Sequence, residues 1–215
     1  MPEMSDDQVD LAALLCSRLC HDLLSPVGAM NNGLELLADE TDPAMRARCI
    51  DLLNESAAAA DNKLKFFRLA FGAAGGFGPT VDPTDARAVA QGLVEDARTK
   101  LVWDVPEGPL PKAAVKILLN MVLIAREALV RGGTLAVGAE SRDGETEIVV
   151  RAEGPKLVLD AQVRAALEGG LDPAQIDSRT AAAHMVQTLA QRGGGMVQIA
   201  GGSNEPLLMG ALIKS

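Results

Sequence analysis

The sequence predicts an α+β protein, in which an N-terminal helical hairpin forms a dimeric four-helix bundle and a C-terminal α/β sandwich follows. Residues 5–73 are almost free of Gly and Pro and rich in Leu and Ala, whereas the later residues alternate between helical and strand patterns. Glycines between residues 72 and 79 mark a linker. We therefore expect two domains, 1–75 and 76–215, in a chain long enough for one large or two small cores.

Two long helices make up the predicted hairpin. The first covers residues 5–38, with Ser5 as N-cap and Asp6 and Asp7 favouring the positive end of the helix dipole. Residues 39–43 form a polar connection, and Pro43 suits the first turn of a second helix over residues 44–73. Because the link is short, the two helices should be antiparallel neighbours.

The C-terminal part predicts helices interleaved with strands. Helical patterns cover residues 86–100, 112–131, 160–168 and 181–192, and strand patterns cover residues 101–105, 134–140, 145–152, 196–201 and 207–213. Arg142-Asp143-Gly144 signals a hairpin turn between two of these strands. We expect a sheet with helices covering one face.

Apolar stripes on the hairpin predict a homodimer. At ~100° of rotation per residue, one face of the first helix collects Leu11, Leu15, Leu19, Leu23, Pro26, Met30, Leu34 and Leu37. The second helix gathers Ile50, Leu53, Ala57, Leu64 and Phe67 in the same way. Two helices bury only part of such stripes, and a pair of hairpins closes the core. The alternative is that the hairpin packs onto its own C-terminal domain.

Charge and composition exclude several classes of function. The formal net charge of −9 would repel nucleic-acid phosphates, and an aromatic content of 2% without Tyr leaves no base-stacking platform. Apolar stretches such as residues 115–125 are too short to span a bilayer, and the start is acidic, so we expect a cytoplasmic protein with no membrane partner. Three cysteines fit reduced thiols.

His21 is the candidate functional residue. It is placed about 200° from the centre of the apolar stripe and should face water. The neighbours on that face are Ser17, Arg18, Ser25, Gly28 and Asn32, flanked by Leu14 and Leu24. An apolar patch around an exposed His indicates a docking site, and small residues there let another backbone approach. Pro26 inside the helix cannot donate to the carbonyl of Asp22.

The run at residues 19–26, LCHDLLSP, resembles the phosphoacceptor box of two-component sensor histidine kinases. In that family a His is followed by an acidic residue, and a Pro lies five positions on. The resemblance implies that His21 is phosphorylated and that the hairpin is half of a dimerisation and phosphotransfer bundle. An imidazole is largely neutral near pH 7 and has one free ring nitrogen for attack on phosphorus.

Three neighbours of His21 have candidate roles and open alternatives. Asp22 would orient the second ring nitrogen or accept its proton, or else be a solvated helix charge. Arg18, one turn earlier, would contact phosphoryl oxygens, or else pair with Asp22 on the surface. Ser25 stands where sensor kinases usually carry an amide, and its hydroxyl would hydrogen-bond in that place.

The C-terminal part resembles the ATP-binding domain of the same kinases, with losses at the nucleotide site. Residues 118–129 and 132–135 resemble the first nucleotide motif, yet Ile124 occupies the magnesium-binding amide position. In the next motif, residues 149–156, Ala152 replaces the adenine-reading aspartate and Lys156 replaces a glycine. An alanine-rich stretch at residues 181–186 stands where active kinases are glycine-rich. We expect a degenerate kinase ATPase-like domain.

A kinase-like bundle with a degenerate nucleotide domain resembles the ChpT-type histidine phosphotransferases of bacterial phosphorelays. The resemblance implies transfer of a phosphoryl group from the receiver aspartate of a hybrid kinase, through His21, to response-regulator receivers, without ATP. It implies no cofactor on this chain, since the receiver carries the magnesium. The alternatives are an ATP-dependent histidine kinase and a non-catalytic dimeric binding module.

A metal site on this chain is not expected. Cys16 and Cys20 lie one turn apart beside His21, but His21 points away from Cys16 and no second ligand pair has suitable spacing. His184, in an alanine-rich helix, should be a packing or boundary residue.

Overall fold

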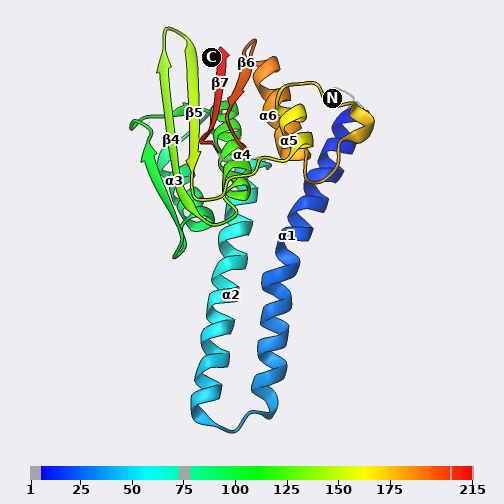
Figure 1. The fold of residues 1–215 in the computed structure, drawn as a ribbon, viewed down its shortest axis with the longest axis vertical. Coiled ribbons are helices and arrows are strands. Elements are labelled where there is room, and N and C mark those ends of the chain that lie inside the picture. The colour runs from blue at the N-terminus through cyan, green and yellow to red at the C-terminus, as the bar shows by residue number, and fades with distance from the viewer. Residues whose placement is uncertain (1–5, 73–77, 204, 215) are drawn as a thin grey trace.

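A computed structural model describes residues 6–72, 78–203 and 205–214, and its most extended feature is the N-terminal hairpin. Helix α1 covers Asp6–Asp39 and α2 covers Pro43–Ala70, lying antiparallel beside each other (Figure 1). The predicted hairpin is therefore confirmed. The expected Ser5 cap and the expected domain boundary at residues 75 and 76 lie outside the described residues.

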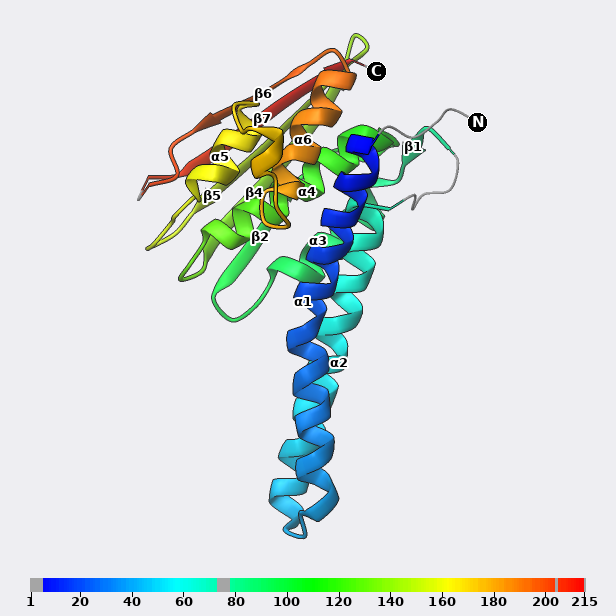
Figure 2. The same cartoon turned by 90° about the vertical axis from the view of Figure 1, so that its right-hand side faces the viewer.

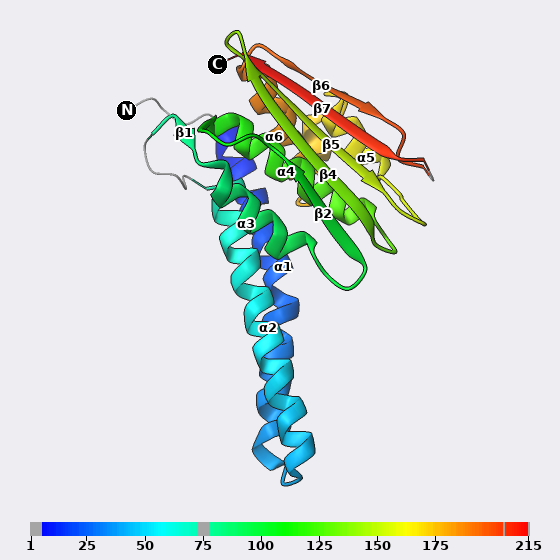
Figure 3. The same ribbon diagram turned by 90° about the vertical axis from the view of Figure 1, so that its left-hand side faces the viewer.

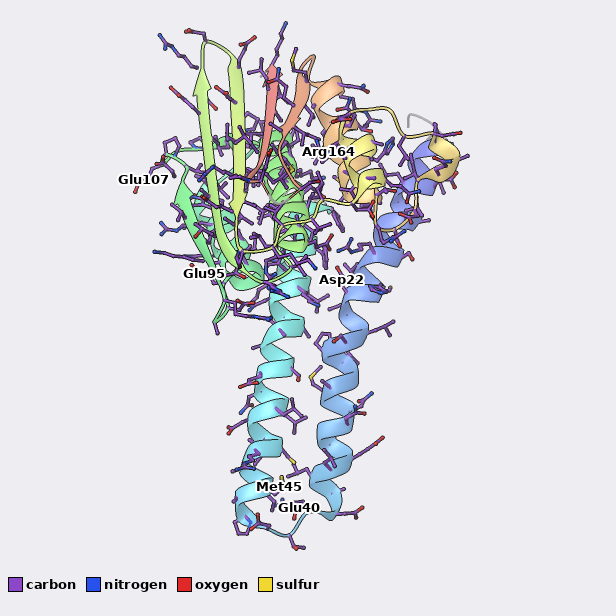
Figure 4. The ribbon with its side chains drawn as sticks, viewed as in Figure 1. Asp22, Glu40, Met45, Glu95, Glu107 and Arg164 are labelled. Atoms are coloured by element: carbon purple, nitrogen blue, oxygen red, sulfur yellow. The ribbon has the colours of Figure 1, made fainter. Side chains whose placement is uncertain are left out.

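The turn between the two helices is closed by local hydrogen bonds. Asp42 caps α2 by accepting from the Met45 N–H at 3.0 Å, and Pro43 opens the helix. Arg46 Nη1 donates to the carbonyls of Leu37 and Glu40, at 3.1 and 2.7 Å. The bond to Leu37 satisfies one of the last carbonyls of α1, which no helical N–H reaches, and the bond to Glu40 holds the turn itself. Glu40 and Met45 lie at the tip, far from the sheet (Figure 4).

The C-terminal domain is built on a five-stranded mixed sheet of order β2-β4-β5-β7-β6. Strand β2 pairs in parallel with β4, and the other pairs are antiparallel. The strands cover Thr99–Asp104 (β2), Gly133–Arg142 (β4), Glu145–Glu153 (β5), Met196–Ala200 (β6) and Leu207–Lys214 (β7). The helices cover Pro83–Val94 (α3), Lys112–Ala128 (α4), Ala161–Leu167 (α5) and Ala181–Arg192 (α6), with a 3-10 turn at Pro173–Gln175. A small second sheet pairs Thr80–Val81 (β1) with Leu110–Pro111 (β3), which the sequence patterns did not predict.

Helices cover one face of the large sheet, as predicted. Along β4, Leu135 and Val137 are buried while Thr134 is exposed, and β5 alternates in the same way. Figures 2 and 3 show α4 and α6 between the sheet and the hairpin, with the far face of the sheet open. The predicted turn joins β4 to β5, with positive φ at Asp143 (54°) and Gly144 (79°), the combination that a type I′ turn requires.

The predicted helix over residues 86–100 was too long at its C-terminal end. Helix α3 stops at Val94, because Asp96 accepts from the backbone N–H groups of Arg98 and Thr99 at 2.7 and 2.8 Å. This local turn competes with helix continuation and starts β2 at Thr99. The pKa of Asp96 is lowered, most of all by the hydrogen bond from the Arg98 N–H and to a smaller extent by the other bonds to this carboxylate.

The upper half of the hairpin packs on the C-terminal domain, and the lower half stands clear of it (Figure 1). Phe66 and Phe67 of α2 belong to the main core. From α4, Asn120 Nδ2 and Lys116 Nζ donate to the carbonyls of Ala70 and Phe71 at 3.3 and 3.4 Å, which satisfies the C-terminal end of α2. The expected alternative, packing onto the chain's own domain, thus describes one half of the hairpin.

Apolar side chains of the lower half remain exposed. Leu34 is 56% exposed, and Leu36, Met45, Ile50 and Leu52 are exposed as well. Leu34 and Ile50 belong to the predicted stripes, so these positions have no cover within one chain. No helix in the described part of the chain is long and apolar enough to cross a membrane.

Candidate functional site

His21 lies on the surface of α1, as its rotation around the helix predicted. Its side chain is 79% exposed, and Nδ1 lies 3.2 Å from Oδ1 of Asp22. An ionised carboxylate only accepts hydrogen bonds, so this contact places the proton of a neutral imidazole on Nδ1. Nε2 is then the nitrogen with a free lone pair.

The Asp22 carboxylate contacts both Arg18 and His21 and is largely shielded from solvent, so it is not a solvated charge. Its side chain is 17% exposed, and Oδ2 accepts from Arg18 Nε at 2.9 Å while Oδ1 faces His21. The two carboxylate oxygens are thus assigned to different neighbours. This arrangement fits the orienting role expected for Asp22, because an occupied Oδ2 restricts rotation of the carboxylate.

The expected position of Arg18 on the exposed face beside His21 is wrong. Its side chain is only 8% exposed and contacts the C-terminal domain. Nη2 of Arg18 donates to Oε1 of Glu127, near the end of α4. The alternative expected for Arg18, pairing with Asp22 four residues on, occurs, but in a buried setting instead of on the surface.

Pro26 lies within α1 and is buried. Because Pro has no N–H, the carbonyl of Asp22 lacks its normal helical donor. Lys63 of α2 supplies the donor, with Nζ 2.7 Å from the Asp22 carbonyl oxygen. The proline therefore opens a position on α1 for a cross-helix hydrogen bond next to His21. Figure 4 shows Asp22 where α1 emerges from the C-terminal domain.

A cleft of about 480 Å³ lies between the hairpin and the C-terminal domain at His21. Its lining comes from α1, α4, α5 and the segment before α6, and consists of Arg18, His21, Asp22, Glu127, Asp160, Val163, Ser178 and Arg179. The sequence interpretation missed the last five of these. No local pattern marks them, since Glu127 and Arg179 reach the site only through tertiary packing.

The remaining predicted residues fall in three places. Leu24 is 70% exposed and Ser25 is exposed, and a Cβ added at Gly28 would meet nothing within 4 Å, so this stretch of α1 is open to a partner. Leu14 does not belong to the exposed patch: it is half-buried, in a cavity with His184 and residues of the 3-10 turn. His184 is the boundary residue that was expected, with Nε2 3.4 Å from Thr188 Oγ1.

The described residues contain no cluster of His, Cys, Asp or Glu that could hold a metal ion. Cys16 and Cys20 are free and exposed, and Cys49 is buried.

Comparisons with known proteins identify the family of this chain. The family described as histidine phosphotransferase C-terminal domain matches residues 83–205. Protein phosphotransferase ChpT of Brucella abortus (strain 2308) is 40% identical over 195 residues, which cover 89% of this chain and 90% of that protein. The chain belongs to the histidine phosphotransferase family.

One solved structure matches the whole fold. A bacterial phosphotransferase determined at 1.7 Å superposes with a TM-score of 0.84 and 36% identity, covering 97% of this chain and 98% of the other. The histidine kinase AdeS of Acinetobacter baumannii aligns with a TM-score of 0.45 and 13% identity over 90% of this chain and 97% of the other. The expected α+β fold, a helical hairpin followed by a domain with helices on one face of a sheet, is confirmed.

Proposed function

We propose that His21 accepts a phosphoryl group from the aspartate of a hybrid-kinase receiver domain and passes it to the receivers of response regulators. One observation carries the proposal: in a member of this family, an exposed imidazole has Nδ1 held by Asp22 and Nε2 free beside a cleft. The phosphorelay partners are inferred from the family and from the open surface around Leu24, Ser25 and Gly28.

The reaction follows from this geometry. Nε2 of His21 attacks phosphorus of the aspartyl phosphate, the N–P bond forms, and the P–O bond to the receiver aspartate breaks, releasing its carboxylate. The imidazole gains positive charge in this step, and Asp22 stabilises it through the Nδ1 proton. Transfer to a second receiver runs the same bonds in reverse. Magnesium would be bound by the receiver, and this chain supplies positioning.

We further propose that the C-terminal domain does not bind ATP. The positions that correspond to nucleotide contacts in kinases lie in the apolar core: Ile124 is 3% exposed, Ala152 is fully buried, and Ala181 to Ala183 are buried. Isoleucine and alanine offer no oxygen to a magnesium ion and no carboxylate to an adenine amine.

A labelling experiment tests both statements. The purified protein is incubated with radiolabelled ATP alone, and separately with a phosphorylated receiver domain. We expect label only in the second reaction, its loss in His21→Ala, and its retention in His184→Gln, which changes the other of the two histidines. Label from ATP alone would instead identify a kinase. Receiver binding without any label would identify a binding module.

We also propose that a second copy of the chain covers the exposed apolar face of the hairpin. Most of the large apolar side chains exposed in the described ranges lie on α1 and α2. A groove of about 610 Å³ between these helices, lined in part by Leu15, Leu19 and Leu64, adds to this face. Sedimentation should give a dimer, which Leu34→Asp with Ile50→Asp dissociates. A parent chain that sediments as a monomer at micromolar concentration contradicts this proposal.

A further inference from the structure

Three hydrogen bonds link the C-terminal domain to His21 in series. Glu127 Oε1 accepts from Arg18 Nη2, Arg18 Nε donates to Asp22 Oδ2 at 2.9 Å, and Asp22 Oδ1 lies 3.2 Å from His21 Nδ1. The first link joins residues that are 109 positions apart in the chain. We call this set, Glu127, Arg18, Asp22 and His21, the relay.

From this series we infer that Glu127 is a positioning residue for His21: acting through Arg18 and Asp22, it holds the imidazole as the Nδ1–H tautomer that leaves Nε2 free for phosphoryl transfer. This inference rests on the function proposed above. It assigns the degenerate domain a part in the chemistry that needs no nucleotide.

The burial of Arg18 gives Glu127 its influence. A guanidinium with 8% exposure loses most of its hydration, so it must be paired on each side that faces protein. Asp22 occupies Nε and Glu127 occupies one terminal nitrogen. If Glu127 became neutral, Arg18 would have a single carboxylate partner and would turn its terminal nitrogens toward Asp22. Both carboxylate oxygens of Asp22 would then bond to Arg18, as in bidentate arginine–carboxylate pairs.

Such a rearrangement would withdraw Oδ1 from His21. The Nδ1 proton would lose its acceptor, and solvent alone would then set the ratio of the two neutral imidazole tautomers. Only the tautomer with a lone pair on Nε2 presents a nucleophile at the exposed edge of the ring. Of the five N–H donors of the Arg18 guanidinium, the Nε–H and one on Nη2 bond to carboxylates.

The experiment measures the tautomer directly. In a His184→Gln background the full-length chain has one imidazole, so ¹⁵N-histidine labelling reports on His21 alone. Two-bond ¹H–¹⁵N correlation spectra, recorded where the ring is neutral, distinguish a protonated Nδ1 from a protonated Nε2. We expect mainly Nδ1–H in this parent and a clear shift toward Nε2–H in Glu127→Gln. Glu127→Asp keeps the charge and should restore part of the parent spectrum.

Reaction rates provide the second readout. Transfer from a phosphorylated receiver should fall roughly tenfold in Glu127→Gln, less than the loss of a direct acid–base group would cost. Glu153→Gln is the matched control, since Glu153 pairs with Arg151 on β5 at 2.7 Å, outside the relay, and should leave both readouts at parent values. Circular dichroism confirms that each variant is folded.

The outcomes separate this inference from the proposed function. An unchanged tautomer ratio and unchanged transfer in a folded Glu127→Gln variant would refute the relay, while loss of label in His21→Ala would still support phosphotransfer. Slower transfer with an unchanged tautomer ratio also refutes it, because Glu127 would then act on receiver docking. Label retained by His21→Ala removes the proposed function itself.

Discussion

The contribution of the Lys63–Asp22 carbonyl hydrogen bond to stability can be measured by substitution. This bond replaces the helical bond that Pro26 removes. Lys63→Met removes the ammonium group and keeps an unbranched apolar stem. Hydrogen bonds with a charged partner contribute about 1.5–3 kcal/mol. The bond is 2.7 Å long, but Lys63 is only half-buried, so we expect the lower part of this range, about 1.5–2 kcal/mol of lost stability.

The decisive comparison is a double-mutant cycle with Pro26→Ala. Alanine restores an N–H four residues after Asp22, so the carbonyl regains a helical donor when Lys63 is removed. Lys63→Met should then cost about 1 kcal/mol less in the Pro26→Ala chain than in the parent. Urea unfolding followed by circular dichroism, at one fixed protein concentration because dimerisation would add to stability, gives the four free energies.

A surface lysine on the same helix is the control. Lys65 pairs with Asp61 four residues before it, and both side chains are more than half exposed, so Lys65→Met should change stability by less than about 0.5 kcal/mol. Equal costs of Lys63→Met with proline and with alanine at position 26 would show that the two groups are uncoupled, and the account of Pro26 would be wrong.

Three further predictions follow from single positions. Gly28→Ala should stabilise α1 by about 0.5–1 kcal/mol in urea unfolding, since its Cβ meets nothing within 4 Å, yet slow transfer from a phosphorylated receiver; unchanged transfer would remove Gly28 from the docking surface. Gly133→Ala should lower stability by about 2–4 kcal/mol, because its Cβ would lie 2.1 Å from the Glu153 carbonyl oxygen at a φ of +146°. Gly108→Ala, at a φ of +122° in open space, should lower it less. Equal losses would mean that backbone strain alone, and not the contact with Glu153, accounts for the cost. Asp96 has a lowered pKa in the folded chain, so its charge stabilises the fold above the unfolded pKa of about 4, and this contribution disappears as the pH falls through the folded pKa. The urea midpoints of Asp96→Asn and the parent should therefore converge between about pH 5 and pH 2. A constant gap between the two midpoints would contradict the assignment.

The sequence alone determined the helical hairpin, most of the helices and strands of the C-terminal domain and the outward position of His21. A helix repeats its faces every 3.6 residues, so the positions of Leu and Ala in α1 indicate which side is apolar without knowledge of any partner. The hairpin turn at Asp143 and Gly144 was predictable from local preference, because Asp-Gly readily adopts the two positive φ values that the turn needs. The motif at residues 19–26 indicated the histidine, and Pro26 indicated which carbonyl would lack a donor.

Only the tertiary structure decided what surrounds that histidine. The sequence interpretation placed Arg18 on the exposed face of α1 with His21, whereas in the structure its side chain is buried and contacts Glu127 of α4. Lys63 reaches Asp22 because α2 returns antiparallel at one particular register. Arg179 enters the cleft from a segment that precedes α6. Residue spacing encodes the faces of one helix, whereas contacts between elements depend on how those faces pack in three dimensions, and that packing is determined by the whole core.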